Sequence, residues 1–185
     1  MRRMLVTLMC LLGACTPTTD PASVPVRRVA EQVALMDEAV ALIKRYEGWH
    51  TENNYPYVGY GHRLQPGETL NARITEKAAD SLLRADLMQK CAVFRRFGRD
   101  SLLLGVLAYN IGEYRLLGYG ARPKSRLVEK LDAGERNIRA EYVSFRKWKG
   151  RVVPSIERRR KEEFELLYGK IKITYRYEND DTARK

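Results

Sequence analysis

The chain has 185 residues, 44% of them hydrophobic, a length that suits one ordinary domain with extensions and leaves little room for two. Lys and Arg number 34 against 23 Asp and Glu, which gives a formal net charge of +11. This balance disfavours a cationic partner and favours an anionic one, such as nucleic acid, anionic lipid or the acidic bacterial wall.

The first residues are typical of an export signal. Arg2 and Arg3 precede an apolar run over residues 5–12, which is far shorter than the roughly 20 residues that a membrane-spanning helix needs. The sequence Leu-Gly-Ala-Cys that ends at Cys15 resembles the lipobox of bacterial lipoproteins, in which the chain is cut before an acylated cysteine. We therefore predict a lipoprotein-type signal peptide over residues 1–14 and a lipid on Cys15, with a plain secretory signal as the alternative.

Residues 15–28 are rich in Pro, Thr and Ser, and we predict that they form a flexible tether between the lipid and the folded part. Cleavage would remove Cys10 and acylation would use Cys15, so Cys91 alone would remain and no disulfide within the domain is expected. Cys91 falls in a helical pattern of leucines at fourfold spacing, so we interpret it as a core residue rather than a reactive thiol.

Residues 29–168 are predicted to form one mostly helical domain. A first helix is expected over residues 29–47, because apolar side chains recur there three and four positions apart, at Val29, Val33, Met36, Val40 and Ile43. Residues 55–64 alternate aromatic residues with glycine, which indicates a strand or hairpin. Thr75 is a suitable N-cap for a helix that runs to about Phe94.

The second half of the domain opens with a strongly apolar stretch. From Ser101 the run has almost no polar side, which predicts a buried central helix in which Gly105 permits close packing. Two further helices are expected over residues 125–131 and 135–148, because Ala133-Gly134 is a natural break between them.

Pro154 occupies the expected first position of a last helix, which should run to about Tyr168. Its inward side is predicted to consist of Ile156, Phe164 and Leu167. The basic cluster at residues 158–161 is expected to be a solvated face, although two of its arginines could instead orient a cleft. Residues 169–185 form a polar tail to which we assign no function.

Glu47 is the first candidate for chemistry. It continues the apolar series of the first helix beyond Ile43, so we expect its carboxyl to meet the core, where burial raises a carboxyl pKa toward the range that general acid catalysis needs. Gly59 and Gly61 fall on one side of an alternating strand and would bare backbone to a ligand. From spacing alone, the alternative is a helix-end glutamate bonded to a nearby loop, with two glycines that serve a bend.

Two segments around this glutamate carry a resemblance. Residues 43–48 read Ile-Lys-Arg-Tyr-Glu-Gly, and residues 58–62 read Val-Gly-Tyr-Gly-His. Together they resemble the catalytic entry of bacteriophage-type lysozymes, glycoside hydrolase family 24, in which a helix ends in Glu-Gly before a β-hairpin. Later segments match the family in order, and they lie at residues 79–87, 107–112, 124–127 and 153–163.

The resemblance implies an α+β, mostly α, lysozyme-like fold, with a small β-hairpin beside the catalytic cleft and a helical C-terminal lobe. It implies cleavage of peptidoglycan between N-acetylmuramic acid and N-acetylglucosamine, with Glu47 as the proton donor. His62 is expected to support Glu47 or the hairpin rather than act as a nucleophile, and Arg159 to support the site. The residues expected to bind substrate are Tyr57, Gly59, Tyr60, Gly61, Asn110 and Gly112, although Asn110 could instead cap its helix.

The chain departs from the family at the second catalytic group. Family members commonly carry Asp or Cys nine positions after the glutamate and Thr six positions beyond that, whereas this chain has Pro56 and His62 there. Alignment backwards from the Gly-x-Gly-His sequence shortens the hairpin and places Tyr57 at the threonine position. No second carboxylate is therefore carried over.

Glu52 is the only acid between Glu47 and Gly59, so it is the local candidate to orient water, with Asn53 or His50 as possible substitutes. A site with a single glutamate would also suit a lytic transglycosylase, in which the muramoyl 6-hydroxyl replaces water and forms an anhydro sugar. Hydrolysis and transglycosylation both remain open at this point.

A different class of function is a non-catalytic wall-binding lipoprotein, which the missing second carboxylate supports and the retained Glu47 opposes. Export argues against a nucleic-acid partner. We expect peptidoglycan and a membrane, reached through the lipid on Cys15, as partners, and a monomer that needs no cofactor or metal. The expected location is the periplasm or cell envelope.

Overall fold

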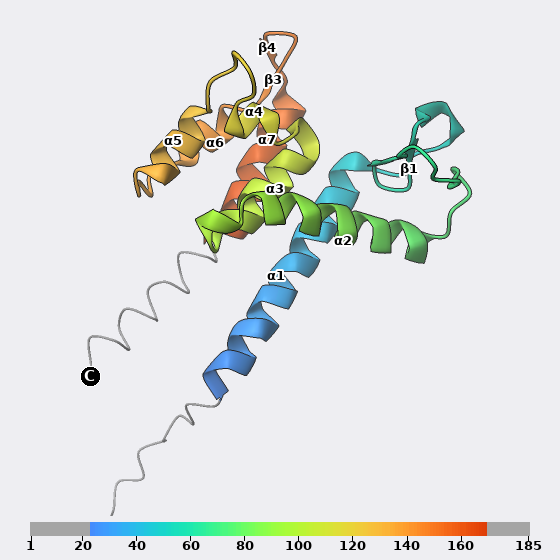
Figure 1. Ribbon diagram of the computed structural model, residues 1–185, viewed down its shortest axis with the longest axis horizontal. Helices are drawn as coiled ribbons and strands as arrows, with labels where there is room; N and C mark the ends of the chain where they lie inside the picture. The colour runs from blue at the N-terminus through green and yellow to red at the C-terminus, as the bar shows by residue number, and fades with distance from the viewer. Residues whose placement is uncertain (1–22, 170–185) are drawn as a thin grey trace, which may run out of the picture. The chain divides into compact units, whose positions relative to one another are not determined.

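The computed structural model describes residues 23–169 of the chain (Figure 1). The predicted signal peptide, Cys15, most of the tether and the tail from residue 170 onward lie outside these residues. The chain divides into two units, residues 1–33 and residues 34–185. The described part of the first unit consists of residues 23–33, which form the beginning of helix α1 (Ser23–Glu47).

Helix α1 begins at Ser23, six residues before the predicted start, so the tether prediction is wrong for residues 23–28. Pro25 falls in the first helical turn, where the backbone N–H groups have no helical acceptor, so the proline does not block the helix. The predicted apolar stripe is buried only in its second half. Val29 and Val33 are 60% and 56% exposed, whereas Val40 and Ile43 are buried.

The second unit is mostly helical and contains two small antiparallel hairpins, which confirms the predicted fold class. After α1 its elements are, in chain order, η1 (Glu52–Asn54), β1 (Tyr57–Val58), β2 (His62–Arg63), α2 (Glu76–Val93), η2 (Arg95–Phe97), α3 (Asp100–Ile111), α4 (Tyr114–Leu117), α5 (Arg126–Asp132), α6 (Arg139–Val143), β3 (Lys147–Trp148), β4 (Arg151–Val152), α7 (Pro154–Glu163) and η3 (Phe164–Tyr168).

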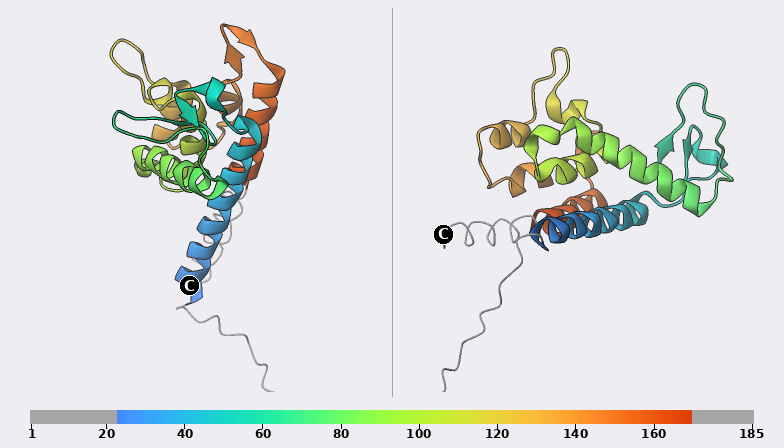
Figure 2. Two further views of the ribbon diagram at one scale, coloured as in Figure 1. Left: turned by 90° about the vertical axis from the view of Figure 1, so that its right-hand side faces the viewer. Right: turned by 60° about the horizontal axis from the view of Figure 1, so that its bottom comes forward.

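Helix α2 joins the hairpin of β1 and β2 to the later helices. Thr75 caps the helix as predicted, because its side chain accepts a hydrogen bond from the backbone N–H of Ala78. Within the second unit, the hairpin lies by the N-terminal end of α2, and α3 and the helices after it gather around the other end (Figures 1 and 2). The fold thus separates a hairpin region from a helical region.

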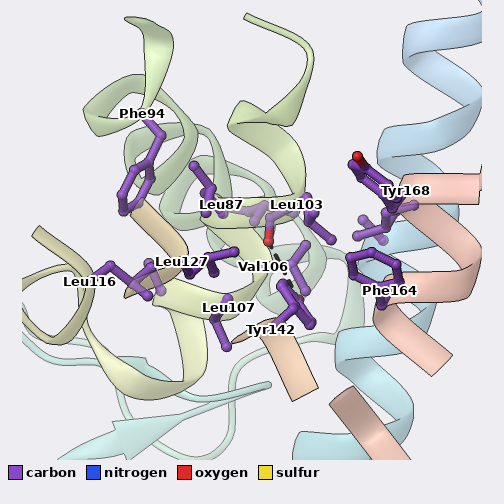
Figure 3. Packing of buried hydrophobic residues seen from close by; sticks show 14 of the residues in the cluster. Leu87, Phe94, Leu103, Val106, Leu107, Leu116, Leu127, Tyr142, Phe164 and Tyr168 are labelled. Atoms are coloured by element: carbon purple, nitrogen blue, oxygen red, sulfur yellow. Dashed lines mark hydrogen bonds between the residues drawn. The ribbon is translucent and has the colours of Figure 1, made fainter. Parts of the chain in front are cut away.

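The core surrounds α3, the predicted buried central helix. Leu103, Leu107 and their neighbours on α3 pack against α2 on one side and against Tyr142 and Phe164 on the other (Figure 3). Gly105 permits the close approach of α2, because a Cβ at this position would lie 2.6 Å from Sγ of Cys91. Burial raises the pKa of the Cys91 thiol to about 11, which agrees with a core residue rather than a reactive thiol.

The C-terminal part contains one wrong prediction. A single helix was expected over residues 135–148, but α6 ends at Val143 and a second hairpin, β3 and β4, follows. Lys149 and Gly150 connect its strands with φ angles of 45° and 80°, the conformation that a tight two-residue hairpin turn requires. Helix α7 then begins at Pro154 as predicted and continues into the π-helical η3.

Candidate active site

Glu47 is the last residue of α1, and side chains from two other helices hold its carboxylate. Nη1 of Arg159, on α7, donates a hydrogen bond of 2.7 Å to Oε1, and Nδ2 of Asn110, on α3, lies 3.4 Å from the same oxygen. The Glu47 side chain is 20% exposed. The expectation of burial is therefore correct in part, but the carboxylate meets a guanidinium and an amide where we predicted apolar neighbours.

Arg159 belongs to a buried charge cluster, which we define as Arg159, Arg160, Glu163 and Tyr142. Nε of Arg159 and Nη2 of Arg160 each donate to Oε1 of Glu163 at 2.8 Å, and the Tyr142 hydroxyl donates to Oε2 at 2.9 Å. Arg159 is 5% exposed and Arg160 is fully buried, so the prediction of a solvated basic face is wrong for these two arginines. Both arginines and Glu163 lie on the side of α7 that faces the core.

Burial is the dominant influence on the ionisation of this cluster. It raises the pKa of Glu163 even though the guanidiniums of Arg160 and Arg159 act in the opposite direction. It also opposes the charge on Arg159, but Glu163 and Glu47 outweigh it and raise the pKa of that arginine. Arg159 is thus a permanent cation shared between two carboxylates, one in the core and one at the surface.

Gly61 opens the space beside Glu47 on the hairpin side. A Cβ at Gly61 would lie 3.6 Å from the Tyr109 hydroxyl, 3.7 Å from Cε1 of His50 and 3.9 Å from Cγ of Glu47. The Tyr109 hydroxyl donates to the carbonyl of Tyr60 at 3.0 Å and so holds the hairpin turn to α3. Burial raises the pKa of Tyr109 well above its ordinary value, so this hydroxyl keeps its proton.

Gly59 does not share this role, contrary to the prediction. Residues 59–61 form the turn of the hairpin, so the two glycines do not alternate along one strand. A Cβ at Gly59 would lie 2.7 Å from Cβ of Ala79, so this glycine packs against α2. The Tyr60 ring meets Trp49 edge-on, and its hydroxyl donates to Glu76 at 3.1 Å.

Glu52 and Asn53 belong to a hollow that Glu47 does not line. Both line a hollow of about 440 Å³, together with Trp49, Thr51, Ala72 and Arg73. The Glu52 side chain is 74% exposed and lies 3.6 Å from Nε of Arg73. Among the described residues, Glu52 has no hydrogen bond or ion pair with Glu47, and its role as a second acid stays a prediction.

His62, the predicted supporting histidine, contacts two carboxylates. Its Nδ1 lies 2.8 Å from Oδ2 of Asp86, on α2, and its Nε2 lies 3.0 Å from Oε2 of Glu68. These bonds tie the hairpin to α2 and to the turn that follows the hairpin. Gly112 closes α3 with a φ of 82°. Tyr57 is 42% exposed, with its ring 6.0 Å from that of His50. The predicted roles of Gly112 and Tyr57 in substrate binding stay predictions.

The sequence did not indicate Tyr109 as a site residue, and it left His50 as one of two possible substitutes for Glu52. The only local signal for Tyr109 was its position directly before Asn110 at the end of the central helix. In residues 23–169, no group of three or more His, Cys, Asp or Glu side chains is arranged to hold a metal ion. Within the same range, no helix is both long and apolar enough to cross a bilayer.

Comparison with known families now decides the assignment. A sequence model of the family described as phage lysozyme matches residues 44–163, about two thirds of the chain. The chain belongs to the phage lysozyme family. This membership supports peptidoglycan lysis as the general activity and a glycoside hydrolase or muramidase as the type of enzyme.

A structural relative agrees with this family assignment. The crystal structure of the active form of the P1 phage endolysin Lyz superposes with a TM-score of 0.56, over 77% of this chain and 94% of that chain. The two sequences are 16% identical, so this similarity shows a shared fold. A search among curated proteins found no match.

Proposed function

We propose that the chain cleaves the glycan strands of peptidoglycan between N-acetylmuramic acid and N-acetylglucosamine, with Glu47 as the general acid. The observation that carries this proposal is the position of the Glu47 carboxyl. It is held at a helix end by α3 and α7, and it stays partly exposed beside the space that Gly61 leaves open. Enzymes that cleave glycan chains need a carboxylic acid that gives a proton to the leaving glycosidic oxygen.

The two oxygens of Glu47 have different surroundings. Both Arg159 and Asn110 bond to Oε1, and no described residue hydrogen-bonds to Oε2. Oε2 is therefore the oxygen available to carry the proton that the leaving glycosidic oxygen needs.

The test is the conversion of Glu47 to glutamine, which keeps size and hydrogen bonding but has no carboxyl proton. Glu47→Gln should lower the clearing of purified peptidoglycan suspensions by at least about 100-fold, because it removes proton transfer to the leaving group. The matched control is Glu162→Gln, which changes a carboxylate that pairs with Arg45. Clearing by Glu47→Gln at the wild-type rate would reject the proposal.

A lytic transglycosylase is the second candidate, because the family resemblance carries over no second carboxylate and Glu52 pairs with Arg73. In that reaction the muramoyl 6-hydroxyl attacks in place of water. Mass spectrometry of the released fragments separates the two chemistries, since hydrolysis yields reducing ends and transglycosylation yields anhydro ends. A third candidate, a wall-binding protein without turnover, would bind the same material and release no fragments.

We also propose that the protein is exported and reaches the wall as a monomer held at a membrane by a lipid on Cys15. The support is the sequence at residues 12–15 and the short apolar run before it. Cys15→Ser should move the protein from the membrane fraction to the soluble fraction of cells. Membrane attachment that survives this substitution would contradict the anchor.

A further inference from the structure

Hydrolysis of a glycosidic bond needs two groups. One gives a proton to the leaving oxygen, and the other takes a proton from the attacking water. The identity of the second group is open, and its assignment rests on the proposed function. Glu52 and Asn53 line a hollow with Trp49, and Glu52 lies 3.6 Å from Nε of Arg73 there.

His50 lies on the opposite face of the same segment. It is paired with Gly59 across an isolated antiparallel bridge, with its backbone N–H 2.8 Å from the Gly59 carbonyl. Successive side chains of an extended segment point to opposite faces. Trp49 and Thr51 therefore face the hollow, while His50 faces the Gly61 side.

The His50 ring and Glu47 approach the same methyl-sized position beside Gly61. Cε1 of His50 and Cγ of Glu47 both lie within 4 Å of the point where a Cβ of Gly61 would be. That space exists because residue 61 is a glycine. The ring of Tyr57 lies 6.0 Å from the imidazole between centroids, at a tilt of 42°.

The bonding of His50 differs from that of the other histidine in the chain. His62 is held between two carboxylates. No described carboxylate pairs with His50, and its buried Nδ1 has no hydrogen-bond partner among the described residues. The charged and titratable groups around it are Glu47 and Tyr109 at the Gly61 space, Tyr57 beside its ring, and Arg159 behind Glu47. Because Nδ1 is closed to solvent, Nε2 is the ring nitrogen that would accept a proton from water.

We propose that His50 is the second catalytic group and acts as the general base. A water molecule attacks the anomeric carbon while neutral His50 accepts one of its protons, and Glu47 gives its proton to the leaving glycosidic oxygen. The bond from the anomeric carbon to that oxygen breaks, and a bond to the water oxygen forms. The resulting imidazolium then loses its proton to solvent and Glu47 regains one, so the site returns to its starting state.

The experiment compares His50→Ala and His50→Gln with the wild type on a soluble peptidoglycan glycan of defined length. Loss of the base should lower kcat by about 100-fold or more and change KM little, because water activation contributes to the transition state. Added imidazole should restore part of the kcat of His50→Ala, because it can enter the space that the ring leaves. Proton NMR should show the first product with inverted configuration at the anomeric carbon, because water attacks from the face opposite the leaving group.

His62→Gln is the matched control. It removes the only other histidine, which the structure places between Asp86 and Glu68. Its effect should be a lower melting temperature, and imidazole should not raise its kcat. Circular dichroism and thermal melting of all variants separate loss of the base from loss of the fold.

Each outcome of this experiment either supports the role of His50 or overturns it. Wild-type kcat in both His50 variants, with Glu47→Gln inactive, overturns the role of His50 and leaves the proposed function standing. A kcat loss that imidazole does not restore assigns His50 a structural role and overturns the proposal, as do retained configuration or anhydro ends. No cleavage by the wild type would overturn the proposed function, and the role of His50 with it.

Discussion

Two clusters of charged side chains secure the two sides of the site in different ways. The buried charge cluster reaches Glu47 from α7 and is closed to solvent at Arg160 and Glu163. The His62 cluster, which we define as His62, Asp86 and Glu68, anchors the hairpin and remains open to water at its carboxylates. The first cluster must balance its charges internally, whereas solvent can exchange protons with the second.

The two clusters should therefore differ in how much free energy of unfolding is lost when one member is removed. A charge in the core has no water to replace a lost partner, so removal of one member leaves the others uncompensated. A partly exposed pair loses less, since water solvates whatever is left. The buried charge cluster should therefore control the fold, and the His62 cluster should control the pH response of the hairpin.

The largest effect is expected for Glu163→Gln. This change leaves Arg159 and Arg160 in the core without their shared carboxylate, and breaking such a buried pair costs about 3–5 kcal/mol of unfolding free energy. Urea unfolding followed by circular dichroism measures it. The adjacent Glu162→Gln is the control, because that exposed pair with Arg45 contributes at most about 1 kcal/mol. Equal losses in the two variants would remove the distinction between buried and exposed ion pairs.

A smaller effect within the same cluster is expected for Tyr142→Phe. The variant keeps the fully buried ring and removes only the hydroxyl that donates to Glu163 at 2.9 Å. A hydrogen bond to a charged group contributes about 1.5–3 kcal/mol, so unfolding free energy should fall by that amount in the same urea experiment. Tyr114→Phe, at a position that is 58% exposed, should leave it unchanged. A neutral result for Tyr142→Phe would show that the carboxylate does not depend on this donor.

The smallest effect, and the one that depends on pH, is expected at the His62 cluster. Burial opposes charge on the imidazole, but hydrogen bonds to Asp86 and Glu68 outweigh it and raise the pKa of His62 above its ordinary 6.5. The Gln65 backbone N–H, and then His62 itself, lower the pKa of Glu68 below its ordinary 4.5.

The signs of these two shifts define a pH window. The His62 contribution is complete below pH 6.5 and is lost as pH rises through its folded-state pKa. The Glu68 contribution is complete above pH 4.5 and is lost as pH falls through its own folded-state pKa. Melting temperature should therefore fall on both sides of that window. His62→Gln should flatten the plot of melting temperature against pH, and its change in melting temperature should be smaller than that of Tyr142→Phe. An unchanged plot in His62→Gln would assign the pH response to other groups.

Local chemistry explains which elements the sequence predicts correctly. The cap at Thr75, the proline at position 154 and the apolar run after Ser101 each act on their immediate neighbours, and the helices begin close to where these signals stand. The hairpin of β3 and β4 was missed because a lysine occupies one of its two positive-φ positions. Lysine is not a residue that turn chemistry would single out.

Adjacent and periodic residues were enough to predict the family resemblance, the mostly helical fold and the place of Glu47 at a helix end. The surroundings of that glutamate, in contrast, depend on residues that folding brings together. Arg159 and Asn110 are 112 and 63 positions away along the chain. Periodicity shows that a side chain faces inward but not which distant side chain it meets. For the same reason, it took folding to place His50 at the Gly61 space beside Glu47, and Glu52 and Asn53 in the hollow with Trp49.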